Sequence, residues 1–155
     1  MKEKGFSLIE VIIVLAIIAV SVSLVTPSLS RLSKTMELKG AAKRVSGILR
    51  YCRSEAIQRG QDYQIVFNPE SREITARRIE ANANEAVQRV FSLPKAIDLK
   101  EIEAGSPQHP SDLPAIEFYP NGGSNGGRIV LESGDRKGYG IKVHFLTGIV
   151  TIESI

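Results

Sequence analysis

Residues 5–20 read GFSLIEVIIVLAIIAV, an apolar run that follows a glycine and contains one carboxylate, Glu10. The apolar character continues to Val25, so the run from Phe6 to Val25 holds 20 residues. A helix rises about 1.5 Å per residue, and 20 residues therefore span about 30 Å, the thickness of the hydrocarbon core of a membrane. The sequence predicts a helix that crosses a membrane.

The residues around the run indicate its orientation and its fate. Lys2 and Lys4 precede it, and positive charge predicts that the N-terminus stays on the cytoplasmic side. A cleaved secretory signal is the alternative, but its apolar region would hold only about 7–15 residues before a small-residue cleavage site. Here residues 23–34, SLVTPSLSRLSK, lead into a helical pattern instead. This favours a retained anchor.

Glu10 needs an explanation, because an ionised carboxylate inside lipid costs roughly 2.5–3.5 kcal/mol. No basic residue follows it within the run. Cleavage between Gly5 and Phe6 would create an amine four residues before Glu10. Such amines on neighbouring copies would neutralise the carboxylates, and Glu10 would then serve assembly.

Residues 4–20, KGFSLIEVIIVLAIIAV, resemble the class III signal of type IV pilins and type II secretion pseudopilins. The resemblance implies that a prepilin peptidase cuts after Gly5 and that Phe6 is N-methylated. It also implies that Glu10 pairs with the N-terminus of an adjacent subunit, and that Pro27 is the family's proline within the long helix. The motif covers about the first 27 residues.

The helical pattern continues after Pro27, which should kink the helix because it removes a backbone donor and clashes with the preceding turn. Gly60 is the expected stop. The single cysteine, Cys52, excludes an intrachain disulfide and fits a small buried core residue better than a reactive thiol. One apolar face is spaced four, three, four, three, four, and consists of Leu38, Ala42, Val45, Leu49, Cys52 and Ala56.

The charge of the chain is mildly basic, with 20 Lys and Arg against 17 Asp and Glu. This permits contact with nucleic acid or anionic lipid without requiring it. Four basic residues form one flank of the second half of the helix, either a contact stripe or, as we prefer, a solvated face. They are Lys39, Lys43, Arg50 and Arg53.

From Gln61 the apolar period changes to two, which is typical of strands. In QDYQIVFN, residues 61–68, the alternating Tyr63, Ile65 and Phe67 share one face. Further strands are expected in residues 72–80, 87–94, 96–102, 115–120, 127–133, 139–145 and 149–154. Short strands separated by turns predict an α+β fold, in which antiparallel sheets form a small sandwich packed against the amphipathic helix.

This layout resembles the GspH/FimT family of minor pilin-like proteins. The best match is IEFYPNGGSNGGRIVLE at residues 116–132, followed by YGIKVHFLTGIVTI at residues 139–152. In that family a strand ending in phenylalanine-x-proline leads into a glycine-rich turn and then into two strands joined by a glycine turn. The matching residues are Phe118, Pro120, Gly122, Gly126, Gly127 and Gly148.

Motifs for cofactors, metals or catalysis are weak. The stretch NGGSNGG, residues 121–127, is followed by a strand and lacks Gly-Lys-Ser/Thr, so a hairpin fits better than a phosphate loop. Asp135 is too isolated for a calcium loop, and His109 and His144 are far from Cys52 for a metal site. No nucleophile motif or carboxylate pair indicates an enzyme, and we expect no cofactor.

These features predict four segments. Residues 1–5 are a leader, residues 6–28 a membrane and fibre-core helix, residues 29–60 an amphipathic helix, and residues 61–155 a β-rich periplasmic domain. By resemblance the chain is a minor pseudopilin of type II secretion near the fibre tip. Its expected partners are other pseudopilins or minor pilins, the prepilin peptidase, inner-membrane lipid and exported proteins.

The alternative function is that of a FimT-like minor pilin that grips DNA during uptake. Its phosphate contacts would come from Arg72, Arg77, Arg78, Arg128, Arg136 and Lys137. Against it stand the small net charge of +3, a C-terminus without basic residues, and the lack of an aromatic run with basic neighbours. We favour the structural role.

Overall fold

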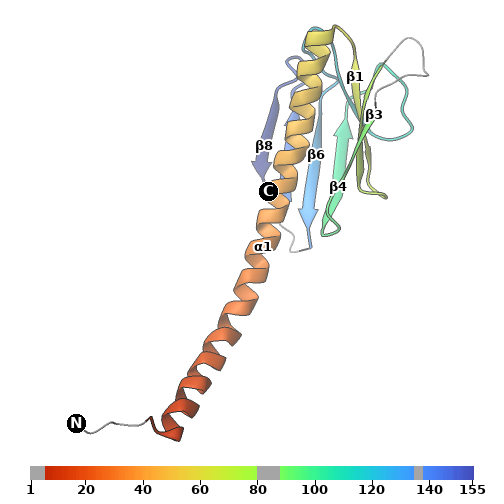
Figure 1. Ribbon diagram of the computed structural model, residues 1–155. Helices are drawn as coiled ribbons and strands as arrows, with labels where there is room; N and C mark the ends of the chain where they lie inside the picture. The colour runs from red at the N-terminus through yellow and green to blue at the C-terminus, as the bar shows by residue number, and fades with distance from the viewer. Residues whose placement is uncertain (1–5, 80–87, 135–137) are drawn as a thin grey trace. The chain divides into compact units, whose positions relative to one another are not determined.

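The computed structural model describes residues 6–79, 88–134 and 138–155, and it describes the side chains of these residues except those of residues 23–32. The chain divides into two compact units, Met1–Thr35 and Met36–Ile155, which we treat separately. Figure 1 shows the elements in chain order, from the helix α1 to the C-terminal strand β8.

Helix α1, Leu8–Arg59, continues through Pro27, and the expected kink at this residue stays a prediction. The helix ends where Gly60 adopts a positive φ of 63°, which confirms the expected stop. The six residues of the predicted apolar face, from Leu38 to Ala56, are each at most 1% exposed. The amphipathic pattern is therefore confirmed.

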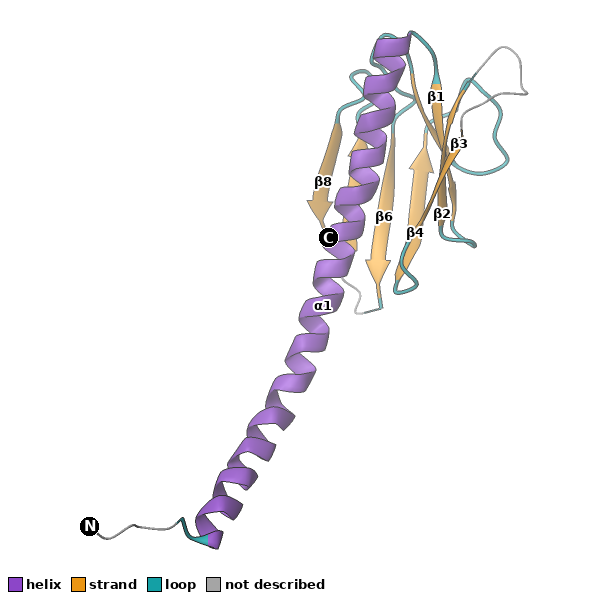
Figure 2. Cartoon of the chain, viewed as in Figure 1, coloured by secondary structure: helices purple, strands orange, loops and turns teal. Residues whose placement is uncertain are grey.

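Eight antiparallel strands make two sheets of four, shown in Figure 2. One sheet has the order β3-β2-β1-β5 and the other the order β4-β6-β7-β8. Every predicted strand is present. Their bounds are β1 Tyr63–Asn68, β2 Glu73–Arg78, β3 Gln88–Ser92, β4 Ile97–Ala104, β5 Ala115–Phe118, β6 Gly127–Ser133, β7 Gly138–Val143 and β8 Val150–Ser154.

A single core joins α1 to both sheets in the unit Met36–Ile155. Ile65 and Phe67 of the first sheet and Leu131 and Ile141 of the second are all fully buried. Tyr63, Ile65 and Phe67 alternate into this core, as the period of two predicts. The helix face and the two inner sheet faces thus exclude water from one another.

The glycine-rich stretch at residues 121–127 does not join β5 to β6 as a hairpin, and this prediction was wrong. It forms only a local turn, across which Phe118 and Ser124 make an antiparallel bridge. β5 pairs with β1, whereas the next strand, β6, pairs with β4 and β7. The stretch therefore carries the chain from one sheet to the other. Gly122 and Gly126 adopt positive φ values of 83° and 72°, which other L-residues adopt only with strain.

Candidate functional site

Phe6 and the N-terminal part of α1, which begins two residues later, expose large apolar side chains on all sides. Phe6 is 80% exposed, Leu8 79% and Ile17 61%. A helix that is apolar all round is stable only when lipid or other helices surround it. In the parts of the chain that the structure describes, no helix has the length and apolar character of a membrane span.

Glu10 lies in the first turn of α1 and is exposed. Its amide donates to the Ser7 carbonyl at 3.0 Å, so the helix begins directly beside Phe6. The positive end of the helix dipole favours a carboxylate at this position. Gly5, the expected cleavage residue, lies outside the described residues. Pro27, the other expected assembly residue, lies within α1, and its side chain is not described.

The basic flank of α1 is only partly a solvated face. Lys39 and Lys43 are exposed, but two arginines bind backbone carbonyls of the unit Met36–Ile155. Arg50 Nη2 donates to the Val150 carbonyl at 3.0 Å. Arg53 Nε donates to the carbonyls of Gly122, at 3.1 Å, and Thr147, at 2.9 Å. The arginines thereby fix loops of the sheets to the helix.

The described arginines considered for DNA contacts do not form one surface, and two of them, Arg72 and Arg77, bind partners within the fold. Arg72 Nε forms an ion pair of 3.0 Å with Asp98. Arg77 lies on the outer face of β2, and Arg78, one residue on, lines a cavity on the core side. Arg128 belongs to the other sheet, on β6. The remaining candidates, Arg136 and Lys137, lie outside the described residues.

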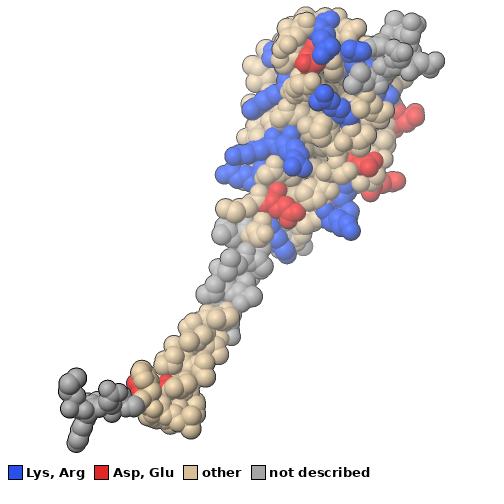
Figure 3. Space-filling view, in the orientation of Figure 1, with Lys and Arg blue, Asp and Glu red and all other residues tan. Residues whose placement is uncertain are grey.

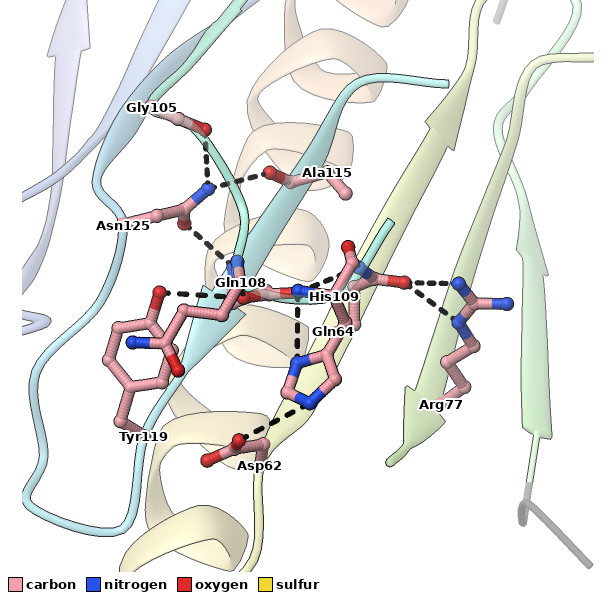
Figure 4. Close-up of polar contacts among 10 residues, drawn as sticks. Asp62, Gln64, Arg77, Gly105, Gln108, His109, Ala115, Tyr119 and Asn125 are labelled. Atoms are coloured by element: carbon pink, nitrogen blue, oxygen red, sulfur yellow. Dashed lines mark hydrogen bonds and ion pairs between the residues drawn. The ribbon is translucent and has the colours of Figure 1, made fainter. Parts of the chain in front are cut away.

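A row of polar side chains crosses the outer face of the first sheet, as Figure 4 shows. Arg77, Gln64 and Glu117 occupy opposite positions on β2, β1 and β5. Arg77 Nε donates to Gln64 Oε1 at 2.8 Å, and Gln64 Nε2 donates to Glu117 Oε1 at 2.8 Å. Gln64 and Glu117 are both fully buried, although they point away from the apolar core.

The segment between β4 and β5 covers this row. The amides of Gln108 and His109 donate to the Glu117 carboxylate at 2.7 and 3.0 Å. His109 Nδ1 lies 3.4 Å from Glu117 Oε1, and His109 Nε2 lies 3.7 Å from a carboxylate oxygen of Asp62. The alternation of apolar and polar residues along the strands does not predict this network. The network depends on Gln108 and His109, which lie in a loop distant in sequence from β1.

Tyr119 and Asn125 complete the network. Tyr119 Oη donates to Glu117 Oε2 at 3.4 Å, and burial, followed by the charge of Glu117, raises the pKa of Tyr119 to about 12. Asn125 Nδ2 donates to the carbonyls of Gly105 and Ala115, and Asn125 Oδ1 accepts from the Glu117 amide. Asn125 therefore joins the ends of β4 and β5 to the crossing segment. Hydrogen bonds satisfy the Glu117 carboxylate, which indicates a structural role.

Metal chemistry has no visible basis in the part of the chain that the structure describes, since no three His, Cys, Asp or Glu side chains there cluster suitably for an ion. The exposed apolar segment around Glu10 is the candidate functional site, because its large apolar side chains need lipid or other helices around them.

Comparison with known families identifies two matching regions. The family described as "Type II transport protein GspH" matches residues 41–147, and the prokaryotic N-terminal methylation motif matches residues 1–26. A curated relative is the type II secretion system protein H of Xanthomonas campestris pv. campestris. It is 32% identical over 147 residues, which cover 95% of this chain and 81% of the relative.

Solved structures share the fold. The minor pseudopilin EpsH from the type 2 secretion system of Vibrio cholerae aligns with a TM-score of 0.61 and 17% identity, over 76% of this chain and 97% of EpsH. The type IV minor pilin FimU of Pseudomonas aeruginosa aligns with a TM-score of 0.55 and 16% identity, over 75% of this chain and 92% of FimU. The expected pilin-like α+β fold is thus confirmed.

Proposed function

The chain belongs to the GspH family of type II transport proteins, and we propose on this basis that it is a minor pseudopilin of a type II secretion system. The observation that carries the proposal is the presence of both matches in one chain, the family over the folded unit and the methylation motif over the N-terminus. The family implies association with other pseudopilins or minor pilins.

The proposed precursor is anchored in the inner membrane by the apolar half of α1. Lys2 and Lys4 favour a cytoplasmic N-terminus, so the unit Met36–Ile155 would lie in the periplasm. From the bilayer the helix would move into a fibre and pack against similar helices. A kink at Pro27 would adjust the direction of the helix for this packing. Support comes from the exposed apolar side chains of Phe6–Val22, which need non-aqueous surroundings.

Within the fibre, Glu10 would pair with the methylated amine of Phe6 on a neighbouring subunit. Pairing with an amine offsets the cost of a carboxylate in an apolar fibre core, and it sets the axial register. The pair requires that prepilin peptidase cuts after Gly5. Replacement of Gly5 by Trp should block cleavage, and an unchanged mature mass in this variant would show that the processing site lies elsewhere.

The functional test is protein export. Deletion of the gene should leave secreted proteins in the periplasm, and the wild-type chain should restore their export. The chain would act near the fibre tip, where it helps to initiate the fibre or contacts exported proteins. Normal export by the deletion strain would contradict the proposal.

The DNA-uptake alternative is not favoured, because Arg72 and Arg77 bind partners within the fold and Arg128 lies on the other sheet. The test is DNA binding by the full chain, titrated against salt. Micromolar binding that falls steeply with salt, and that is lost in the double variant Arg77→Ala and Arg78→Ala, would restore the alternative.

A further inference from the structure

A groove runs between α1 and the strand β3 in the unit Met36–Ile155. It consists of two adjoining cavities, of about 90 and about 280 Å³, which share Tyr51, Cys52, Ala76 and Arg89. We call it the α1–β3 groove. None of its lining residues belongs to the unit Met1–Thr35 or to the buried Glu117 network, so neither accounts for it.

The floor of the groove is apolar. Ile48, Cys52 and Ala76 lie at its base, each less than 9% exposed, and Phe91 of β3 packs against the core beside them. Desolvation by burial raises the pKa of the Cys52 thiol to about 12, so the floor carries no charge at neutral pH. Gly47 leaves the groove open, because a Cβ atom there would meet nothing within 4 Å.

The rim of the groove is positively charged. Four arginines line it, namely Arg44, Arg59, Arg78 and Arg89. Among the described lining residues, Glu55 is the one acid, and it already accepts from Arg59 at 2.5 Å, so the formal charge of the lining is +3. Arg89 lies 5.5 Å from the centre of the Tyr51 ring, a cation–π contact that holds it over the groove. Figure 3 shows several groups of Lys and Arg on the face that carries α1.

The wall formed by β3 is a sheet edge. In the part of the chain that the structure describes, β3 pairs with β2 alone and stands at the end of the order β3-β2-β1-β5. Its residues are exposed apart from the half-buried Phe91, and Val90 is 53% exposed. An edge strand can accept an extended segment from another protein through backbone hydrogen bonds.

We propose that the α1–β3 groove binds an extended acidic segment of a partner protein. The segment adds as a strand to β3, its carboxylates pair with Arg44 and Arg89, and an apolar side chain fills the space beside Gly47. The positive rim favours a negatively charged segment. The edge position of β3 favours an extended conformation, and the apolar floor favours apolar side chains that alternate with the acidic ones. This goes beyond assembly through the N-terminal helix, because it assigns a second contact on the folded unit.

The probe is a fluorescein-labelled hexapeptide of alternating Glu and Leu. It is titrated by anisotropy against the full chain in nanodiscs of phosphatidylcholine. We expect saturable binding, with at least tenfold weaker binding of a Lys and Leu peptide and of a Glu and Ser peptide. Equal affinity for the Lys and Leu peptide would overturn the proposal.

Two pairs of variants locate the contact. Gly47→Leu should fill the groove, weaken binding at least tenfold and leave the melting temperature unchanged or raised. Gly40→Leu is its matched control, since Gly40 also has open space on α1 but does not line the groove. The double variant Arg44→Gln and Arg89→Gln should likewise bind the peptide at least tenfold more weakly. Its control is the double variant Lys95→Gln and Lys142→Gln, which removes the same charge at exposed positions elsewhere and should keep the wild-type affinity.

Wild-type affinity in the Gly47→Leu variant would overturn the groove as the binding site. Displacement of the peptide by duplex DNA, sensitive to the arginine variants but not to Gly47→Leu, would make the rim a polyanion site and also overturn the proposal. All groove variants should still enter the fibre, which separates this inference from the proposed function.

Discussion

At the scale of the residue, Glu117 is the clearest determinant of stability outside the apolar core. Its fully buried carboxylate accepts from two backbone amides and the Gln64 side chain. Removal of the carboxylate takes the acceptor from the two amides and leaves the Gln64 amide group with the His109 carbonyl alone. We expect Glu117→Ala to lower the free energy of unfolding by about 3 kcal/mol, measured by urea denaturation.

The control is Glu153→Ala, because Glu153 is exposed on β8. It should change the free energy of unfolding by less than about 0.5 kcal/mol. Equal stability of the two variants would mean that the network around Glu117 contributes nothing to the fold.

The buried thiol of Cys52 predicts a dependence of stability on pH. Burial raises its pKa from 9.0 to about 12, so above pH 9 the thiol ionises in the unfolded chain but stays neutral in the folded chain. The stability that it contributes is complete below pH 9 and is lost as the pH rises towards 12. The wild-type chain should therefore lose about 1.4 kcal/mol per pH unit relative to Cys52→Ala in this window.

Urea denaturation of both proteins at pH 8, 9, 10 and 11 measures this difference. A constant difference across the series would contradict the prediction. Cys52 is buried, which confirms its prediction as a core residue. The prediction followed from its place on the apolar face of the helix, which points inwards.

Residue-scale features that depend on distant segments escaped prediction. Gln64 alternates with buried apolar residues on β1, and a period of two indicates only that it faces the other side of the sheet. Its burial follows from the loop that carries Gln108 and His109, which no local pattern reveals.

At the scale of the element, α1 and the strands follow closely from their periodicities. The helix face from Leu38 to Ala56 is buried as expected, and Gly60 ends the helix. The path from β5 to β6 could not be predicted from periodicity. β5 pairs with β1 and β6 pairs with β4, and these partner strands are distant in sequence. A glycine-rich segment is equally compatible with a hairpin turn and with a connection between two sheets.

Replacement by alanine should have opposite effects on the free energy of unfolding at two glycines of α1 and its C-terminal end. Gly47→Ala should raise the free energy of unfolding by about 0.5–1 kcal/mol, because Gly47 is mid-helix and faces open space. Gly60→Ala should lower it by about 1 kcal/mol, because Gly60 has a φ of +63°. Chemical denaturation measures both, and shifts of the same sign would contradict the roles assigned to the two glycines.

At the scale of the whole molecule, the family followed from two stretches of sequence, the run after Gly5 and the glycine-containing strands near the C-terminus. The α1–β3 groove did not, because its lining comes from α1, β1, β2 and β3, which only the fold brings together. The sequence therefore identifies the protein family more readily than it identifies the surfaces of the folded unit that contact partners.

We propose that the chain enters a fibre through its N-terminal helix and that Glu10 sets the register. The most direct measurement is the amount of the chain in sheared fibres, relative to the amount in membranes, for the wild type, Glu10→Ala and Glu37→Ala. Glu37 is the control, as an exposed glutamate on the same helix. We predict that Glu10→Ala inserts normally in membranes but falls at least tenfold in fibres, while Glu37→Ala matches the wild type. Wild-type amounts of Glu10→Ala in fibres would contradict the claim.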